Sequence, residues 1–280
     1  MLIWVFLLES GVSAVDKTAA DIGIFGGSGF YKLLDNAEER TVETPYGAPS
    51  DKVMLGTLGG KKVAFLPRHG VHHTIPPHKI NYRANAYAMK SLGVKVIISP
   101  CAAGSLQTHV EPGDFVVCDQ YVDRTNSRID TFYDGPISTH VSAADPYNEQ
   151  LRQLAIQAAK ECKIKVHEKG TVVVIQGPRF STKAESKWFT SMGWEVINMT
   201  QYPEAHLCRE LSMGVVNISL ITDYDSGLVG SVEPVSHAEV MKVFGGNLEK
   251  LQRLLIRFCE LLPDPAKLDM GDALEGARFT

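Results

Sequence analysis

The fold class is decided by one stretch, Asn81-Tyr-Arg-Ala-Asn-Ala-Tyr-Ala-Met-Lys-Ser-Leu-Gly-Val-Lys-Val-Ile-Ile-Ser-Pro-Cys-Ala-Ala-Gly104. Residues 81–92 are predicted to form a helix that Gly93 closes. Residues 94–99 are an apolar run typical of a buried strand, and this run leads into the small residues 100–104. A helix followed at once by a buried strand is typical of an α/β protein.

The same alternation continues on both sides of this stretch. Strands are predicted at 22–25, 53–57, 63–66, 115–118, 171–175, 195–198 and 215–222, with Gly59-Gly60 as a hairpin turn. Helices are predicted from Pro146, capped by Asp145, to about 162, from 203 to 213, and from a capping box at Ser236 onward. Together they predict one α/β domain with a largely parallel or mixed sheet.

Composition excludes several classes of protein. The chain has 280 residues, a net charge of −4 and 44% hydrophobic residues. These values exclude an intrinsically disordered chain, and the slight acidity argues against a nucleic-acid binder. The five cysteines are widely spaced with no Cys-x-x-Cys, which predicts reduced thiols in a cytoplasmic protein.

The expected domain runs from residue 21 to 262. Residues 1–8 are apolar but too few to span a bilayer, and Glu9 follows them. We interpret residues 1–20 as a disordered leader or a mis-assigned start, with a signal peptide as the alternative. Residues 263–280 are polar and rich in Gly and Ala, which predicts a flexible tail. No later stretch is apolar enough to span a membrane, so no membrane partner is expected.

A glycine-rich turn, Gly26-Gly-Ser-Gly29, follows the first strand. A dinucleotide fingerprint would need glycine where Lys32 stands, and the phosphate-binding Walker pattern is absent. The turn therefore predicts either an anion site that uses its amides and Ser28, or a simple turn.

Arg68-His69-Gly70 stands at the end of another predicted strand. A guanidinium offers a planar fork of donors that suits phosphate, and an ion pair at the surface is the alternative role for Arg68. The histidines nearby are not expected to bind a metal ion, because local glycine and prolines prevent a regular helix and no other ligand completes a set.

Two polar motifs also follow predicted strands. Asn198-Met-Thr200 could offer a hydroxyl to an anion and an apolar surface to a sugar, or could be core and cap residues. Thr222-Asp-Tyr-Asp225 places two carboxylates where ligands of α/β sheets gather, or else forms a solvated turn. Cys101 lacks a nearby basic partner in sequence and is not expected to act as a nucleophile.

These motifs occur together, and in order, in a known family. The chain resembles the trimeric purine nucleoside phosphorylases, most closely their 5′-methylthioadenosine phosphorylase branch, over about residues 21–262. The resemblance rests on Gly26-Gly-Ser-Gly29, Thr44-Pro-Tyr-Gly-x-Pro-Ser50, Arg68-His-Gly70, Asn81-Tyr-Arg-Ala-Asn85, Gly177-Pro-Arg-Phe-Ser181, Ala184-Glu-Ser186, Asn198-Met-Thr200 and Thr222-Asp-Tyr-Asp225.

The resemblance implies a fold, a reaction and a site. The fold is a mixed, partly barrel-like sheet flanked by helices, and the reaction is phosphorolysis of a purine nucleoside without metal or organic cofactor. Phosphate would be bound by Ser28, Arg68, His69, the backbone at Cys101 and Ala102, and Thr200. Met199 would lie under the ribose, Phe180 would face the base, and Asp223 and Asp225 would grip the adenine edge. In a homotrimer, a loop with His140 would reach the neighbouring subunit's site.

Four positions bear on the choice within the family. Relatives that act on 6-oxopurines have Glu where this chain has Ser181 and Asn where it has Asp223, so both residues favour a 6-amino base. His237 favours a 5′-hydroxyl instead, because the methylthioadenosine branch has an apolar residue there. Most members of that branch have Thr where this chain has Cys101, which removes one hydroxyl contact to phosphate.

The chemistry suits these assignments. Cleavage of the glycosidic bond builds positive charge on the ribose and negative charge on the purine, so a phosphate dianion and an acidic group at N7 stabilise the two fragments. We therefore expect a methylthioadenosine phosphorylase, with adenosine as a candidate second substrate. The alternatives are a phosphorylase of 6-oxopurine nucleosides, a non-catalytic nucleoside-binding protein and a nicotinamide-dependent reductase.

Overall fold

Strand β5 (Val96–Ser105) organises the fold, because three other strands pair with it. The computed structural model describes residues 19–26, 33–226 and 236–278. Within them, β1 (Ile22–Gly26) and β11 (Gly214–Tyr224) run parallel to β5, and β10 (Val196–Asn198) runs antiparallel to its last residues. Eleven strands of the described chain join in this way into one mixed sheet.

The remaining strands extend the sheet away from β5 in three directions. Beyond β1 lie β4 (Lys61–Pro67), β3 (Val53–Leu58) and β2 (Asp35–Arg40). Beyond β10 lie β9 (Thr171–Ile175) and β7 (Gln120–Arg124), and β11 carries the short β6 (Phe115–Val116) and β8 (Val166–His167).

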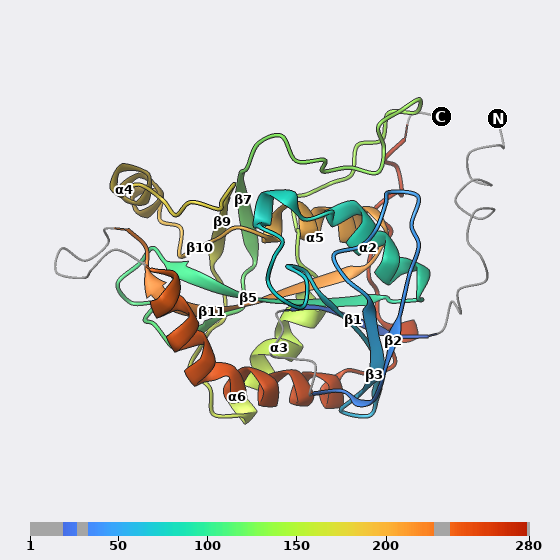
Figure 1. Cartoon of the computed structure of the whole chain (residues 1–280), viewed down its shortest axis with the longest axis horizontal. Helices are drawn as coiled ribbons and strands as arrows, with labels where there is room; N and C mark the ends of the chain where they lie inside the picture. The colour runs from blue at the N-terminus through green and yellow to red at the C-terminus, as the bar shows by residue number, and fades with distance from the viewer. Residues whose placement is uncertain (1–18, 27–32, 227–235, 279–280) are drawn as a thin grey trace.

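Helices cover both faces of this sheet (Figure 1). One face holds α2 (Tyr82–Ser91) and α5 (Gln201–Glu210), and the other holds α3 (Glu149–Glu161) and α6 (His237–Leu261). Along β5, Ile97 joins the core beneath α2 and α5, whereas Val96 and Ile98 join the core beneath α3 and α6. Side chains of a strand alternate between the two faces, so a strand with two covered faces is apolar throughout. The prediction of an α/β domain with a central mixed sheet flanked by helices is confirmed.

Most of the predicted elements lie where expected. The antiparallel pair β3 and β4 turns at Gly59 and Gly60, whose φ angles of +54° and +76° favour glycine. Asn81 caps α2, since its side chain accepts a hydrogen bond from the amide of Ala84 at 3.2 Å. β5 is longer than the predicted strand, because residues 100–104 continue it instead of leaving it.

Two helices differ from the predictions. Helix α3 begins at Glu149 with Asn148 as its cap, because the Asn148 amide bonds the carbonyl of Val215 and ties the preceding residues to β11. Helix α4 (Lys183–Ser191) was not predicted, although Thr182 and Glu185 form a capping box at its start. The described part of the tail, for which the sequence predicts flexibility, contacts the domain at two points: Asn148 Nδ2 donates to the carbonyl of Asp269, and Ala277 is buried.

Candidate active site

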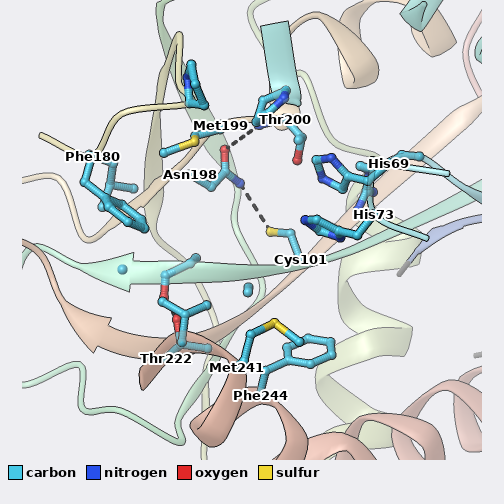
Figure 2. Close-up of a pocket in the computed structure, with 18 of the residues that line it drawn as sticks. His69, His73, Cys101, Phe180, Asn198, Met199, Thr200, Thr222, Met241 and Phe244 are labelled. Atoms are coloured by element: carbon cyan, nitrogen blue, oxygen red, sulfur yellow. Dashed lines mark hydrogen bonds between the residues drawn. The ribbon is translucent and has the colours of Figure 1, made fainter. Parts of the chain in front are cut away.

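A cavity of about 750 Å³ opens where the predicted motifs meet. Its walls are the second half of β5, the ends of β9, β10 and β11, the segment after β4, and the first half of α6. In Figure 2, Phe180 and Met199 lie toward one end of the cavity and His69 and His73 toward the other. Ligands of α/β sheets commonly bind at strand ends of this kind.

The cavity brings together most of the predicted site residues. Those that line it are Arg68, His69, Cys101, Ala102, Phe180, Met199, Thr200, Asp223 and Asp225. They come from segments up to about 150 residues apart in sequence, and only the fold makes them neighbours.

Four predicted residues are not among the lining residues. Ser181 is buried beside Phe180, and Ser28 lies outside the described residues. His237 begins α6, but its side chain is outside the described part of the chain. His140 lies on a loop away from the cavity of its own chain, with its amide bonded to the carbonyl of Ala277 at 2.8 Å. Its contact with a neighbouring subunit stays a prediction.

Asp223 is aimed by an irregularity in β11. The register of β11 on β5 shifts between Ile221 and Asp223, which marks a bulge that redirects the side chains around it. Asp223 Oδ2 accepts a hydrogen bond from Thr222 Oγ1 at 2.7 Å. A Cβ at Gly104 would lie 2.9 Å from Asp223 Oδ1, so the carboxylate needs glycine at that point of β5.

Asp225 has a different environment. Burial raises the pKa of its carboxyl, and the nearby Ser226 backbone and the Ser186 and Ser181 side chains only partly offset this effect. Its Oδ2 is buried and has no hydrogen-bond partner among the described residues. A carboxyl that retains its proton more readily than usual can act as a donor, and so the two aspartates differ in chemistry.

Arg68 lines the cavity, but most N–H groups of its guanidinium already donate to other residues of the protein. Its Nε and Nη2 donate to the two carboxylate oxygens of Glu204, each at 2.8 Å, and both side chains are almost fully buried. Nη2 also donates to Ser99 Oγ and Nη1 to the carbonyl of Pro100. We predicted that the fork would face phosphate, but four of its five N–H groups are used inside the protein. One N–H on Nη1 is left for a ligand.

His69 is held neutral. Burial lowers its pKa to about 4, with smaller lowering effects from Arg68 and His73 against the raising effect of the Ile75 carbonyl. Nδ1 lies 2.9 Å from that carbonyl, which can only accept, so Nδ1 carries the proton. Nε2 is then an acceptor, and it can accept a hydrogen bond from a hydroxyl of phosphate or sugar.

Cys101 stands where most of the similar enzymes have threonine, and its sulfur accepts hydrogen bonds. The amide of Asn198 donates to its sulfur at 3.2 Å, and that of Asn217 at 3.5 Å (Figure 2 shows the first contact). Asn198 also orients the next turn, because its Oδ1 lies 3.4 Å from the amide of Thr200.

The first half of α6 supplies an apolar wall. Val240, Met241, Phe244 and Leu248 line the cavity, whereas Leu251, Leu255 and Phe258 further along the helix are buried in the core. These apolar residues fall at helical spacing, a pattern that by itself indicates one continuous core face. The structure divides this face, and the N-terminal half meets the cavity instead (Figure 2).

Two residues that support the site were missed in the sequence. Glu204 stands on the buried face of α5 with Leu207 and Cys208, and a lone acid on such a face is a signal for an ion pair. Arg128 donates to the carbonyls of Gln176, Met199 and Tyr202 at 2.8, 3.0 and 2.5 Å. It lies in a segment without predicted structure, and no sequence signal identifies it.

The chain is similar to known phosphorylases over most of its length. Residues 21–260 match the model of the phosphorylase superfamily. The S-methyl-5′-thioadenosine phosphorylase of Thermofilum pendens is 49% identical over 91% of this chain and 97% of its own length. A purine nucleoside phosphorylase of Streptomyces coelicolor is 46% identical over 93% and 96% of the two chains.

Solved structures agree as well. The methylthioadenosine phosphorylase of Schistosoma mansoni in complex with adenine superposes with a TM-score of 0.87 at 35% identity, covering 92% of this chain and 99% of the other. A methylthioadenosine phosphorylase from an antarctic soil metagenomic library gives a TM-score of 0.88 at 40% identity, covering 94% and 93%.

The fold and cavity define an α/β enzyme with a nucleoside-sized site at its strand ends. The chain belongs to the phosphorylase superfamily. Among the residues that the structure describes, no helix is both long and apolar enough to cross a bilayer. Nor do those residues hold a group of three His, Cys, Asp or Glu side chains suited to a metal ion.

Proposed function

We propose that this protein catalyses the phosphorolysis of 5′-methylthioadenosine, with orthophosphate as co-substrate. The products are adenine and 5-methylthioribose 1-phosphate. The observation that carries the proposal is one cavity in which Arg68 and Thr200 are combined with a carboxyl pair, Asp223 and Asp225. A pure nucleoside-binding protein would not need the first two residues.

The reaction follows from these positions. A phosphate oxygen forms a bond to C1′ while the bond from C1′ to N9 breaks, and the electron pair moves into the purine. Adenine presents an acceptor at N7 and a donor at its 6-amino group on one edge. A carboxyl pair in which Asp225 binds a proton more readily than usual can donate to N7 and accept from the 6-amino group. Met199, whose sulfur packs against Gly177, offers an apolar surface to the ribose.

The apolar wall of α6 favours a methylthio group at C5′. Val240, Met241 and Phe244 offer no hydrogen bond to a hydroxyl, whereas a thioether needs none. The 49% identity to a methylthioadenosine phosphorylase supports the same choice.

We further infer that the enzyme needs no metal or organic cofactor and works as a homotrimer in the cytoplasm. Its place would be in methionine and purine salvage, since it returns a thiosugar and a free base. Neither nucleic acid nor membrane is a proposed partner.

A second candidate is a phosphorylase of 6-oxopurine nucleosides such as inosine and guanosine, which the 46% identity to a purine nucleoside phosphorylase favours. The test measures base release from methylthioadenosine, adenosine and inosine, each with and without phosphate. We expect phosphate-dependent release that is fastest with methylthioadenosine. Preference for inosine would support the second candidate, and release that ignores phosphate would exclude both.

A further inference from the structure

The buried ion pair of Arg68 and Glu204 changes the net charge that surrounds a bound phosphate. Arg68 and Glu204 are each 3% exposed and share two hydrogen bonds of 2.8 Å. Ser99 Oγ donates to the same carboxylate at 2.5 Å, and Gln201 Nε2 donates to Ser99 Oγ. Every polar atom of the carboxylate is thus engaged before any ligand arrives.

Glu204 therefore balances the cation of the cavity. Among the described residues that line it, Arg68 is the only Arg or Lys, and Asp223 and Asp225 are the acids. Burial holds the His69 ring neutral, which supports the same count. Apart from the His73 ring, phosphate thus meets no net positive charge from the described part of the wall.

An arginine whose charge is balanced by a carboxylate suits the attacking phosphate better than an unpaired arginine does. An unpaired buried guanidinium would bind the dianion strongly in the ground state and would draw charge from the attacking oxygen. With its fork held by Glu204, Arg68 offers a single Nη1 donor, and the phosphate keeps the charge that stabilises the cation forming at C1′.

We propose that Glu204 is a positioning residue of the phosphate site: it fixes Arg68 and weakens phosphate binding in exchange for faster chemistry. This inference rests on the proposed phosphorolysis. It predicts that removal of the Glu204 charge tightens phosphate binding and slows turnover, the opposite of what a merely structural role would give for binding.

The test is Glu204→Gln. Ser99 and Pro100 still hold the guanidinium in this variant, so Arg68 keeps its place but loses its balancing charge. We expect the phosphate concentration for half-saturation to fall about tenfold and kcat to fall about tenfold, with the nucleoside KM unchanged. Phosphate binding is measured twice, from steady-state rates and from the rise in Tm with phosphate alone.

Glu210→Gln is the matched control. Glu210 lies on the same helix, is equally buried at 3%, and bonds the loop at Thr131 and Phe132. We expect it to leave the half-saturation for phosphate unchanged. A Glu204→Gln enzyme whose half-saturation is unchanged or higher would overturn the proposal.

Two further variants test the proposal in case Glu204→Gln does not fold. Arg68→Gln leaves the Glu204 charge facing phosphate, and Arg68→Gln with Glu204→Gln removes both charges. The double variant should bind phosphate several-fold more tightly than the single one, and equal binding would overturn the proposal. If the wild type releases no base with phosphate, the proposed function fails, while the Tm titration still reports on Glu204.

Discussion

Asp223 owes its position to one irregularity in β11, and we propose that it selects the base. The bulge after Ile221 and the missing side chain at Gly104 let its carboxylate enter the cavity. A carboxylate accepts from a 6-amino group, whereas it repels a 6-oxo group, which is also an acceptor.

Asp223→Asn should therefore move preference from adenine toward hypoxanthine nucleosides. The amide can donate to a 6-oxo group, and we expect the ratio of kcat/KM for adenosine to that for inosine to fall by about tenfold or more. Both values are measured in wild type and variant. Loss on both substrates by the same factor would mean that Asp223 does not select the base.

Asp225 gives a prediction for stability. Burial raises the pKa of this carboxyl in the folded chain above its value in the unfolded chain. The folded state thus binds the proton more tightly, and stability is lost as pH rises through the folded pKa. Asp225→Asn removes that loss, so we expect a higher Tm at pH 7, by roughly 2–4 °C for each kcal/mol, and no difference near pH 3.

Asp114→Asn is the control with opposite sign. Burial raises the pKa of the Asp114 carboxyl, but hydrogen bonds from His167, the Glu111 backbone and Lys165 outweigh this effect and lower it. Its ionised form stabilises the fold above the unfolded pKa, so this variant should lose Tm at pH 7. A Tm of Asp225→Asn that is unchanged or lower at pH 7 would contradict the burial argument.

At the scale of elements, Arg128 joins the ends of β9 and β10 to the start of α5. Its guanidinium collects the carbonyls of Gln176, Met199 and Tyr202, and it lies over the ring of Tyr82 at 5.3 Å. These segments include Met199, the proposed ribose surface, and lead toward Phe180, so we propose that Arg128 acts on the substrate through them.

Arg128→Lys should separate the two substrates. An ammonium is a point donor that cannot span three carbonyls, so the nucleoside wall loosens. We expect kcat/KM for the nucleoside to fall about tenfold to a hundredfold, with a smaller change in the phosphate KM. Arg124→Lys is the control, because Arg124 ends β7, the strand beside β9, and its guanidinium lies over the exposed ring of Trp188. An equal rise in KM for the nucleoside and in KM for phosphate would point to a general loss of structure.

Elements could be predicted from sequence where local chemistry decides them. Gly59-Gly60 fixes the β3–β4 hairpin, and Asn81 with Gly93 bounds α2. The start of α3 was misplaced because a bond to Val215, distant in sequence, determines it. α4 was missed because its exposed Trp188 and Met192 hide the helical pattern, although its capping box was there to find.

The site was predictable to the same degree. Most of the predicted site residues line the cavity, because family resemblance gives positions that no local rule gives. The partner of Arg68 was not found, since Glu204 lies 136 residues away and only the packing of α5 on β5 brings them together. A residue that positions another residue, as Glu204 positions Arg68, is seldom marked by a sequence motif of its own.

At the scale of the whole molecule, the loop with His140 is fixed without reaching its own cavity. Glu210 accepts from Thr131 Oγ1 and from the amide of Phe132, at 2.8 and 2.7 Å. At its other end, Thr139 forms a bridge with Arg278, and Figure 1 shows this loop beside the C-terminal segment, away from α6. Both ends of this loop are fixed outside the cavity of its own chain. We propose that the loop contacts a second copy of the chain.

Mixed oligomers test whether His140 completes a neighbour's site. His140→Ala spoils the loop and Asp223→Ala spoils the cavity, so each variant alone should have little activity. If chains mix at random in equal amounts, half of the cavities are intact and half of the loops beside them are intact. About a quarter of the sites then combine both, and about a quarter of wild-type activity should return on mixing. The measurement is the rate of methylthioadenosine phosphorolysis after the two variants are refolded together, with each refolded alone as control. Activity that stays at the sum of the two separate variants would show that every cavity works with its own chain alone.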